Sequence, residues 1–341
     1  MKADRPLYAT KLGRAYVGDC EKLLAAAVGN VTRGKVQLLF TSPPFVLNRK
    51  KRYGNLQGEA YIEWLAGFAS LFREALTESG SIVIELGNAW EPGQPTMSTL
   101  AIEALLAFKK AGGFHLCQEF VCFNPARLPT PAQWVTVERC RVKDAFTRVW
   151  WLSTTTKPKA DNRRVLTQYS DAMQKLLMKG TYNPGRRPSG HRIGKTSFLR
   201  RHDGAIPPNV LISPFATLTE WVATPMDLLP NSNTANFGDR YWAHCRQKDI
   251  EPHPARMPAG LVEFFVRFLT DEDDLVLDPF AGSNTTGAVA ESLKRRWIAI
   301  EISREYLGPS RVRFRTAKQP AKRPSFGSRS SAQRILFAEA Q

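Results

Sequence analysis

The sequence predicts an α/β protein whose large, mostly parallel sheet is assembled from two separated stretches of chain. Short apolar runs alternate with stretches of helical periodicity, and this strand–helix–strand order is typical of parallel sheets. The alternation stops near residue 156, where Gly, Pro, Ser and basic residues take over, and it resumes near residue 258. The chain has 341 residues, of which 43% are hydrophobic, so it is long enough to bury a substantial core.

The first stretch, residues 1–155, carries the alternation most clearly. Residues 36–40 form an apolar run that stops at Pro43 and Pro44. Because proline can neither donate to a sheet nor continue a helix, this run predicts a buried strand followed by a rigid turn. Residues 60–76 carry apolar side chains at helical spacing and predict one helix. The remaining patterns predict a helix at 100–110 and strands at 82–86, 116–123 and 146–152.

The later part of the chain divides into three regions. Residues 156–250 lack sheet-like runs and predict an inserted region with one helix at 168–178. Residues 251–315 return to the α/β pattern, while residues 316–341 have the composition of a flexible, basic tail. The α/β pattern predicts helices at 258–269 and 286–294 and strands at 274–278 and 297–301.

The charge distribution indicates a polyanionic partner. Lys and Arg number 48 against 31 Asp and Glu, a formal net charge of +17. Residues 181–205 and 308–341 together hold 12 of these surplus charges, so the rest of the chain is nearly ordinary in charge. Such clusters attract phosphate backbones, although a basic run can also be a solvated face or tail.

Cysteine usage and hydropathy exclude several classes. The five cysteines include no C-x-x-C pair, so we expect neither a disulfide framework nor a metal site, and we interpret them all as buried thiols. No apolar run approaches the roughly 20 residues of a membrane-spanning helix. The polar N-terminus has no signal-peptide core, which favours a cytoplasmic protein.

The segment from Asp278 to Gly287 predicts a nucleoside site. A turn of small residues between a strand and a helix lets a ligand approach the backbone. The segment is not G-x-G-x-x-G, so the nicotinamide-type fingerprint is absent. The next strand ends at Glu301, whose carboxylate can accept hydrogen bonds from two ribose hydroxyls. We therefore favour an adenosine site over an ordinary turn followed by a surface glutamate.

The segment Thr41-Ser42-Pro43-Pro44-Phe45 predicts a site for an amino group. The two prolines fix the backbone and leave carbonyls free to accept hydrogen bonds. The Ser42 side chain and the Pro43 carbonyl form a rigid pair of acceptors for the two hydrogens of an exocyclic amine, and Phe45 offers a face for a planar base. A proline-stiffened loop is the alternative, but open α/β sheets bind ligands at this edge.

Together these two segments resemble the amino-group DNA methyltransferases of restriction-modification systems, which use S-adenosylmethionine. Two further segments are similar to family motifs: His253-Pro254-Ala255-Arg256-Met257-Pro258 and Gly18-Asp19-Cys20. The catalytic motif precedes the cofactor motif, as in the β group of that family. The resemblance implies a Rossmann-like, seven-stranded sheet with permuted motif order. It also implies that residues 1–155 are the catalytic half, 156–250 the target-recognition region and 251–315 the cofactor-binding half.

The resemblance also implies roles for individual residues. The catalytic positions are Ser42, Pro43, Pro44 and Phe45. The cofactor-binding positions are Asp19, Thr41, His253, Arg256, Asp278, Phe280, Ala281, Gly282, Ser283, Asn284, Thr285, Thr286 and Glu301. The expected partners are double-stranded DNA and a functionally paired restriction endonuclease, with the protein acting as a monomer and without a membrane.

The residues present and the family resemblance favour one target atom. Carbon-5 methylation of cytosine uses a cysteine nucleophile, usually after a proline, and none of the five cysteines follows a proline. Within the family, Ser at the position of Ser42 usually accompanies cytosine N4 methylation, whereas Asp or Asn accompanies adenine N6. We expect cytosine N4, with the base flipped out of the duplex. Adenine N6 methylation stays an alternative, as does a non-catalytic DNA-binding relative, which the intact Ser42 motif disfavours.

Two basic segments are candidate DNA contacts. The loop after the Ser42 motif has four consecutive basic residues that could meet phosphates near the flipped base, or be solvated. The inserted region combines hydrogen-bonding and basic side chains suited to base edges and phosphates. The candidates are Arg49, Lys50, Lys51, Arg52, Ser189, His191, Arg192, Lys195, Arg200 and Arg201. For the basic tail we expect only non-specific affinity.

Overall fold

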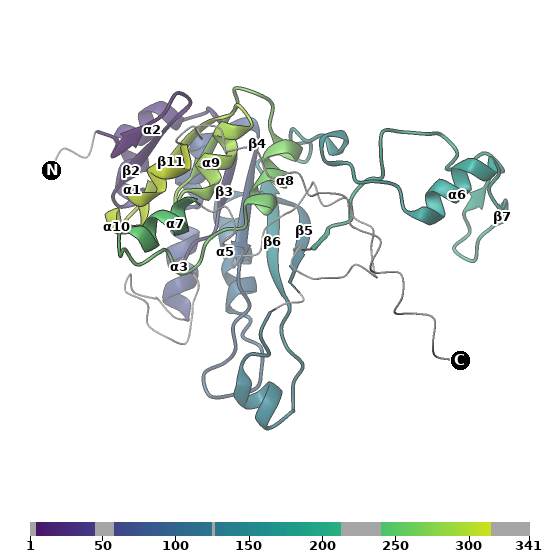
Figure 1. Cartoon of the computed structure of the whole chain (residues 1–341), viewed down its shortest axis with the longest axis horizontal. Helices are drawn as coiled ribbons and strands as arrows, with labels where there is room; N and C mark the ends of the chain where they lie inside the picture. Colours follow the sequence, from purple (N-terminus) through teal and green to yellow (C-terminus); the bar gives the residue numbers. More distant parts are fainter. Residues whose placement is uncertain (1–4, 45–57, 125–126, 213–239, 315–341) are drawn as a thin grey trace, which may run out of the picture.

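The computed structural model describes residues 5–44, 58–124, 127–212 and 240–314 (Figure 1). Its centre is one mixed sheet in which five adjacent strands run parallel and the strand β6 runs antiparallel to both of its neighbours. Across the sheet the order is β1 (Tyr8–Ala9), β2 (Gly13–Val17), β11 (Arg296–Glu301), β10 (Leu275–Asp278), β3 (Val36–Thr41), β4 (Leu76–Leu86), β6 (Phe146–Ser153), β5 (His115–Phe123) and β9 (Val210–Ile212).

This sheet confirms the α/β prediction and corrects its strand count. Among the described residues this sheet has nine strands instead of seven, because the short strands β1 and β9 extend the two edges of a seven-stranded centre. The late part of the chain contributes β10 and β11, which lie between β2 and β3. The two stretches of chain are therefore interleaved in one sheet, and their functional motifs reach the same edge.

Helices cover both faces of the sheet. The described helical segments are α1 (Cys20–Ala25), α2 (Ala27–Thr32), α3 (Glu59–Gly67), α4 (Ala69–Ala75), α5 (Leu100–Gly112), η1 (Gln133–Val137), η2 (Asn162–Val165), α6 (Asp171–Lys179), α7 (Arg240–Gln247), α8 (Ala259–Leu269), α9 (Thr285–Ser292), α10 (Arg304–Leu307) and η3 (Pro309–Phe314). Leu39 of β3 packs with the core under α3, α4 and α5, whereas Leu38 and Phe40 pack with the core under α8 and α9. Such two-sided burial explains why every residue of β3 is buried and why four of its six residues are apolar.

Most predicted helices and strands are confirmed, but the bounds of one helix are wrong. The single helix expected over residues 60–76 is two helices that meet at Phe68, and its last residue already begins β4. The expectation that all five cysteines are buried is also wrong. Cys20 and Cys245 are buried, but Cys117 and Cys122 are half-buried and Cys140 is exposed. All five are free thiols. Across the described ranges, no helix has the length and apolar character needed to span a bilayer.

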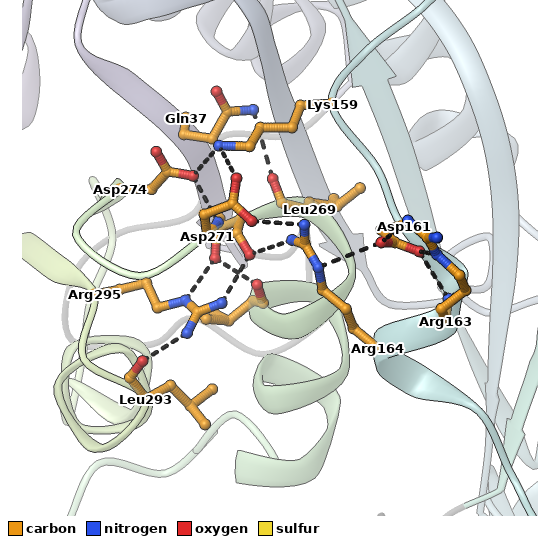
Figure 2. A network of polar contacts seen from close by, with 12 residues as sticks. Gln37, Lys159, Asp161, Arg163, Arg164, Leu269, Asp271, Asp274, Leu293 and Arg295 are labelled. Carbon is orange, nitrogen blue, oxygen red and sulfur yellow. Dashed lines mark hydrogen bonds and ion pairs between the residues drawn. The ribbon is translucent and has the colours of Figure 1, made fainter. Parts of the chain in front are cut away.

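A charged cluster fixes the beginning of the inserted region to the sheet. We call Lys159, Asp161, Arg164, Asp271, Asp274 and Arg295 the Asp271 cluster (Figure 2). Asp271 accepts from Lys159 and from Arg164, each at 2.6 Å, and Lys159 also bonds Asp274 at 2.6 Å. Arg164 and Arg295 both donate to the Thr270 carbonyl at 2.7 Å. Since Asp271 and Asp274 precede β10, this anchor lies at the edge of the sheet opposite the carboxyl ends of the parallel strands.

Candidate active site

The carboxyl ends of the parallel strands bring the predicted motifs together. Thr41 ends β3, Asp278 ends β10 and Glu301 ends β11, and these three strands pair in parallel register. The Gly18 N–H donates to the Glu301 carbonyl at 3.0 Å, so Asp19 also lies at this edge. Open α/β sheets bind ligands at such an edge, where neighbouring strands are followed by loops.

Asp278 joins the two main motifs. Its Oδ1 accepts from Thr41 Oγ1 at 2.9 Å and from the Phe280 N–H at 3.1 Å, while its Oδ2 accepts from Thr286 Oγ1 at 2.6 Å. Burial raises the pKa of Asp278 to about 6, although these three hydrogen bonds oppose the rise. The carboxyl group therefore holds the Ser42 turn against the Phe280 turn at a cost in stability when it is ionised.

An Asp278→Asn substitution should remove this cost. Because folding raises the pKa, the folded state binds the proton more tightly, and the stability contributed by Asp278 falls as pH rises from about 4 to about 6. Asparagine can still accept from Thr41 and Phe280 and can donate to Thr286. We expect the difference in unfolding free energy, variant minus wild type, to increase by on the order of 2 kcal/mol between pH 4 and pH 7. Denaturant titrations at both pH values measure this, and an offset that is constant with pH would contradict it.

Glu301 is held as an acceptor beside the small-residue turn. Its Oε2 accepts from the Gly282 N–H at 2.8 Å and its Oε1 from the Ser303 N–H at 2.9 Å. Burial raises the pKa of Glu301, against the opposing effect of these backbone hydrogen bonds. A carboxylate has about four acceptor sites, so Glu301 retains acceptor capacity beyond its backbone donors, which include Ile302. Asp19 caps α1 by accepting from the Glu21 N–H at 2.9 Å.

The turn before α9 requires glycine at position 282. Gly282 has φ +51°, and a Cβ placed there would lie 3.0 Å from two atoms of the His253 ring. The His253 ring packs edge-on against Tyr306 with ring centroids 4.7 Å apart. The backbone N–H of His253 donates to the Tyr241 hydroxyl at 3.1 Å. Tyr241 belongs to α7, which the sequence pattern did not predict. The His253 segment is thus brought to the Gly282 turn.

The other predicted cofactor residues support the turn from behind. Asn284 caps α9 by accepting from the Gly287 N–H at 3.0 Å and donates to the Tyr8 hydroxyl at 2.9 Å. The Ser283 carbonyl accepts from Arg313 Nε at 2.9 Å. Phe280 packs against rings of α3 and the residue that follows it, Trp64 and Phe68. Ala281 and Thr285 are buried within the turn, and Arg256 is half-buried.

Glu85 is a site residue that the sequence analysis missed. It is the only ionisable residue of the run 82–86, lies one residue before the end of β4 and is 8% exposed. Its carboxyl group hydrogen-bonds Ser42 and Thr147, and burial raises its pKa while these bonds and the charge of Arg127 oppose the rise. The sequence signal that could have identified Glu85 was an acidic residue inside an otherwise apolar strand. Pro43 is buried and Pro44 half-buried beside it, while Phe45 lies outside the described residues.

The structure places the candidate DNA contacts of the inserted region away from this edge. Strands β7 (Gly185–Arg186) and β8 (Arg192–Ile193) form a hairpin whose turn is closed by the Arg187 N–H donating to the His191 carbonyl at 2.8 Å. With α6 it lies well apart from the sheet (Figure 1). The candidates there are all exposed: Ser189, His191, Arg192, Lys195, Arg200 and Arg201. Arg49, Lys50, Lys51 and Arg52 lie outside the described residues.

The chain is similar to known proteins over nearly its whole length. A family model described as DNA methylase matches residues 36–310. The Type II methyltransferase M.PvuII of Proteus hauseri is 43% identical over 312 residues, covering 91% of this chain and 86% of that protein. A solved structure, PvuII DNA methyltransferase (cytosine-N4-specific), matches with a TM-score of 0.69 at 36% identity, covering 93% of this chain and 91% of that chain. The DNA adenine methyltransferase YhdJ of Escherichia coli (strain K12) is 46% identical over 59 residues, 17% of this chain and 20% of that protein.

Proposed function

The chain belongs to the N6/N4 DNA methylase family, and from that premise we propose that it methylates the exocyclic N4 amino group of cytosine at specific sites in duplex DNA. The observation that carries this proposal is the bridge of Asp278 between Thr41 and Thr286. It joins the turn that can accept an amino group to the turn that can hold a nucleoside. Because these are the two halves of a methyl transfer, their junction supports an enzyme over a DNA-binding relative without activity.

The Gly282 turn and Glu301 fit the adenosine part of S-adenosylmethionine. We propose that the spare acceptor capacity of Glu301 takes the ribose hydroxyls and that the backbone at Gly282 lies against the ligand. Asp19 would lie near the adenine, and His253 and Arg256 near the methionine end, as the family resemblance implies. When bound, S-adenosylmethionine supplies an electrophilic methyl group.

The Ser42 turn would orient the amine for transfer. Ser42 can donate its hydroxyl hydrogen to the Glu85 carboxylate, which leaves the oxygen of Ser42 as an acceptor for one amino hydrogen. The Pro43 carbonyl would accept the other hydrogen. Both interactions hold the nitrogen lone pair out of conjugation with the ring and toward the methyl group. The contribution of this chain is thus orientation and electrostatic stabilisation, without a covalent intermediate.

Cytosine is favoured as the target base by two independent facts. Ser42 occupies the position that usually accompanies N4 methylation, and the solved structure at 36% identity is described as cytosine-N4-specific. Adenine N6 is the alternative, because an adenine methyltransferase shares a 59-residue stretch with this chain. Treating unmodified genomic DNA with the protein and S-adenosylmethionine, followed by modification-resolved sequencing, tests the proposal. N4-methylcytosine at one short sequence is expected, and DNA without methylated bases would refute it.

We further propose that residues 156–250 select the target sequence and that the protein, as a type II methyltransferase acting as a monomer, protects DNA from a cognate endonuclease. A two-stranded ribbon fits the major groove, and the β7–β8 hairpin presents exposed polar and basic side chains in such a ribbon. Arg187 lies over the ring of Tyr182 at 5.7 Å, and Tyr182 packs on Phe198 at 5.1 Å, which fixes the base of the hairpin.

Substitutions in this region should separate two kinds of contact. Arg200→Ala and Arg201→Ala together should weaken DNA binding about equally for specific and unrelated duplexes and lower the dependence of affinity on salt. His191→Ala, at the turn of the hairpin, should instead lower kcat/KM about 10-fold or more on the specific site and reduce discrimination against single-base variants of it. Titrations at two salt concentrations and competition between sites measure both. Unchanged discrimination in His191→Ala would contradict the assignment of the hairpin to base reading.

A further inference from the structure

Two loops project together from the edge of the sheet that carries Ser42. We call residues 127–145, between β5 and β6, the arm; residues 87–99, after β4, lie against it. The pairing of Phe123 with Phe146 and the bond from the Asn124 N–H to the Ala145 carbonyl at 2.6 Å close its neck. Figure 1 shows this part of the chain, which includes η1, extending beyond the ends of β5 and β6.

The neck of the arm lies beside the proposed catalytic turn. In the sheet order β3–β4–β6, only β4 separates the end of β3 from the first residues of β6. Between them stands Glu85, whose carboxyl group hydrogen-bonds Ser42 on one side and Thr147 of β6 on the other. Arg127, which begins the arm, donates to the Phe146 carbonyl at 2.9 Å. The arm therefore starts at the wall of the Ser42 site.

The arm is a built structure. The Trp134 carbonyl accepts from the N–H groups of Cys140 and Arg141 at 3.0 and 3.2 Å, which folds the arm back on itself. The Arg141 guanidinium reaches the other loop, where it donates to the Pro95 carbonyl at 2.8 Å and lies 6.0 Å from the centre of the Trp90 ring. These contacts hold the arm in one orientation, so its outward side chains have defined places.

Three large apolar side chains of the arm are exposed among its polar and basic residues. Leu128 is 72% exposed, Val137 69% and Val142 86%. The arm also carries four basic residues against two acidic ones. Single exposed apolar side chains are common on protein surfaces, so the basic residues of the arm and its position beside the Ser42 site carry the argument for a partner. A duplex fits both features, because basic side chains bind phosphates while apolar side chains can enter a base stack.

We propose that the arm contacts duplex DNA next to the target base and that Leu128 fills the space which the flipped base leaves. This inference rests on the proposed function. Leu128 is the exposed apolar residue next to Arg127 at the neck, and Lys143 Nζ holds this point by donating to the Arg127 carbonyl at 3.2 Å. An apolar side chain in the vacated space offsets the loss of base stacking, so the flipped state becomes more populated.

The test uses two duplexes that contain the site found by sequencing. One is fully paired, and the other lacks the base opposite the target, so that flipping costs less. Leu128→Ala should lower kcat/KM on the paired duplex about 10-fold and leave it within about twofold of wild type on the second duplex. Leu128→Met, which retains an apolar side chain of similar length, should keep activity on both. Leu106→Ala, a truncation of an exposed apolar side chain on α5, outside the arm and the site, is the matched control and should be unaffected.

Two results would overturn the inference. Wild-type activity of Leu128→Ala on the paired duplex would show that the side chain does not assist flipping. An equal loss on both duplexes would show that Leu128 acts on folding or on the chemical step. If wild type methylated no site in the sequencing experiment, the proposed function would be refuted, and the role of the arm with it.

Discussion

Replacing Ser42 by alanine is expected to slow methyl transfer by about 100-fold or more, the usual loss when one preorganised hydrogen-bonding group is removed from a reacting centre. The alanine variant cannot accept an amino hydrogen and leaves the buried Glu85 carboxyl group without one of its partners. Cofactor affinity should stay within about twofold, because Ser42 lies outside the Glu301 turn. Single-turnover rates on DNA and calorimetric binding of S-adenosylmethionine measure the two quantities separately.

Ser292→Ala is the matched control for this variant. Its hydroxyl donates within α9 to the Val289 carbonyl at 2.8 Å and is exposed, so both the rate and the affinity should be unchanged. A Ser42→Ala enzyme that transfers methyl groups at the wild-type rate would show that the turn does not orient the amine.

The same turn sets the pH dependence. When ionised, Glu85 can only accept from Ser42, whereas the protonated acid can donate to Ser42 and occupy the oxygen needed for the amine. Burial raises the pKa of Glu85 above that of an ordinary glutamate. The rate of methyl transfer should therefore fall as the pH decreases. The midpoint of this acid limb should lie at a higher pH than the midpoint for an exposed glutamate. In Glu85→Gln this limb should flatten, because the group no longer titrates. A limb that stays in place in the variant would mean that another group causes it.

Replacing Glu301 by glutamine should raise the dissociation constant of S-adenosylmethionine about 100-fold. This corresponds to the partial loss of two hydrogen bonds that the ligand donates to a charged group. The carboxylate accepts from the Gly282 and Ser303 N–H groups at once. An amide of the same shape has only one acceptor oxygen, so one N–H would face an NH₂ group and the spare acceptors would be lost. Calorimetric titration of the folded variant measures the change.

Glu263→Gln is the control for charge removal. Glu263 pairs with Arg267 on α8 at 2.7 Å and lies outside the cofactor turn, so its loss should not alter cofactor binding. The transfer rate of Glu301→Gln at saturating S-adenosylmethionine should approach wild type, in contrast to Ser42→Ala. A dissociation constant within about threefold of wild type would contradict the ribose-binding role of Glu301.

The local sequence pattern predicted the strands of the sheet well. It predicted poorly the helices whose positions depend on contacts between distant parts of the chain. The strand ending at Thr41 and the strand–turn–helix around Gly282 were predictable, since apolar runs bounded by proline and small residues specify them locally. The break of the 60–76 helix at Phe68 was not, because the apolar periodicity continues across it. Helix α7 has only Tyr241 and Cys245 buried, which is too weak a pattern to detect.

The candidate site shows the same division. Ser42 and Glu301 were recognisable because short motifs surround them. Glu85 was missed because its role depends on pairing between β3, β4 and β6, and a partner brought by sheet register leaves no spacing in the sequence. The bonds of Asn284 to Tyr8 and of Ser283 to Arg313 likewise join residues from distant parts of the chain. Fold-level contacts of this kind become visible only in three dimensions.

The most direct test of the central claim is mass analysis of nucleosides from DNA treated with the purified protein and S-adenosylmethionine. We predict N4-methylcytosine as the methylated nucleoside with wild type and at least a 100-fold lower rate of its formation with Ser42→Ala. N6-methyladenine alone, or equal formation of N4-methylcytosine by both proteins, would contradict it.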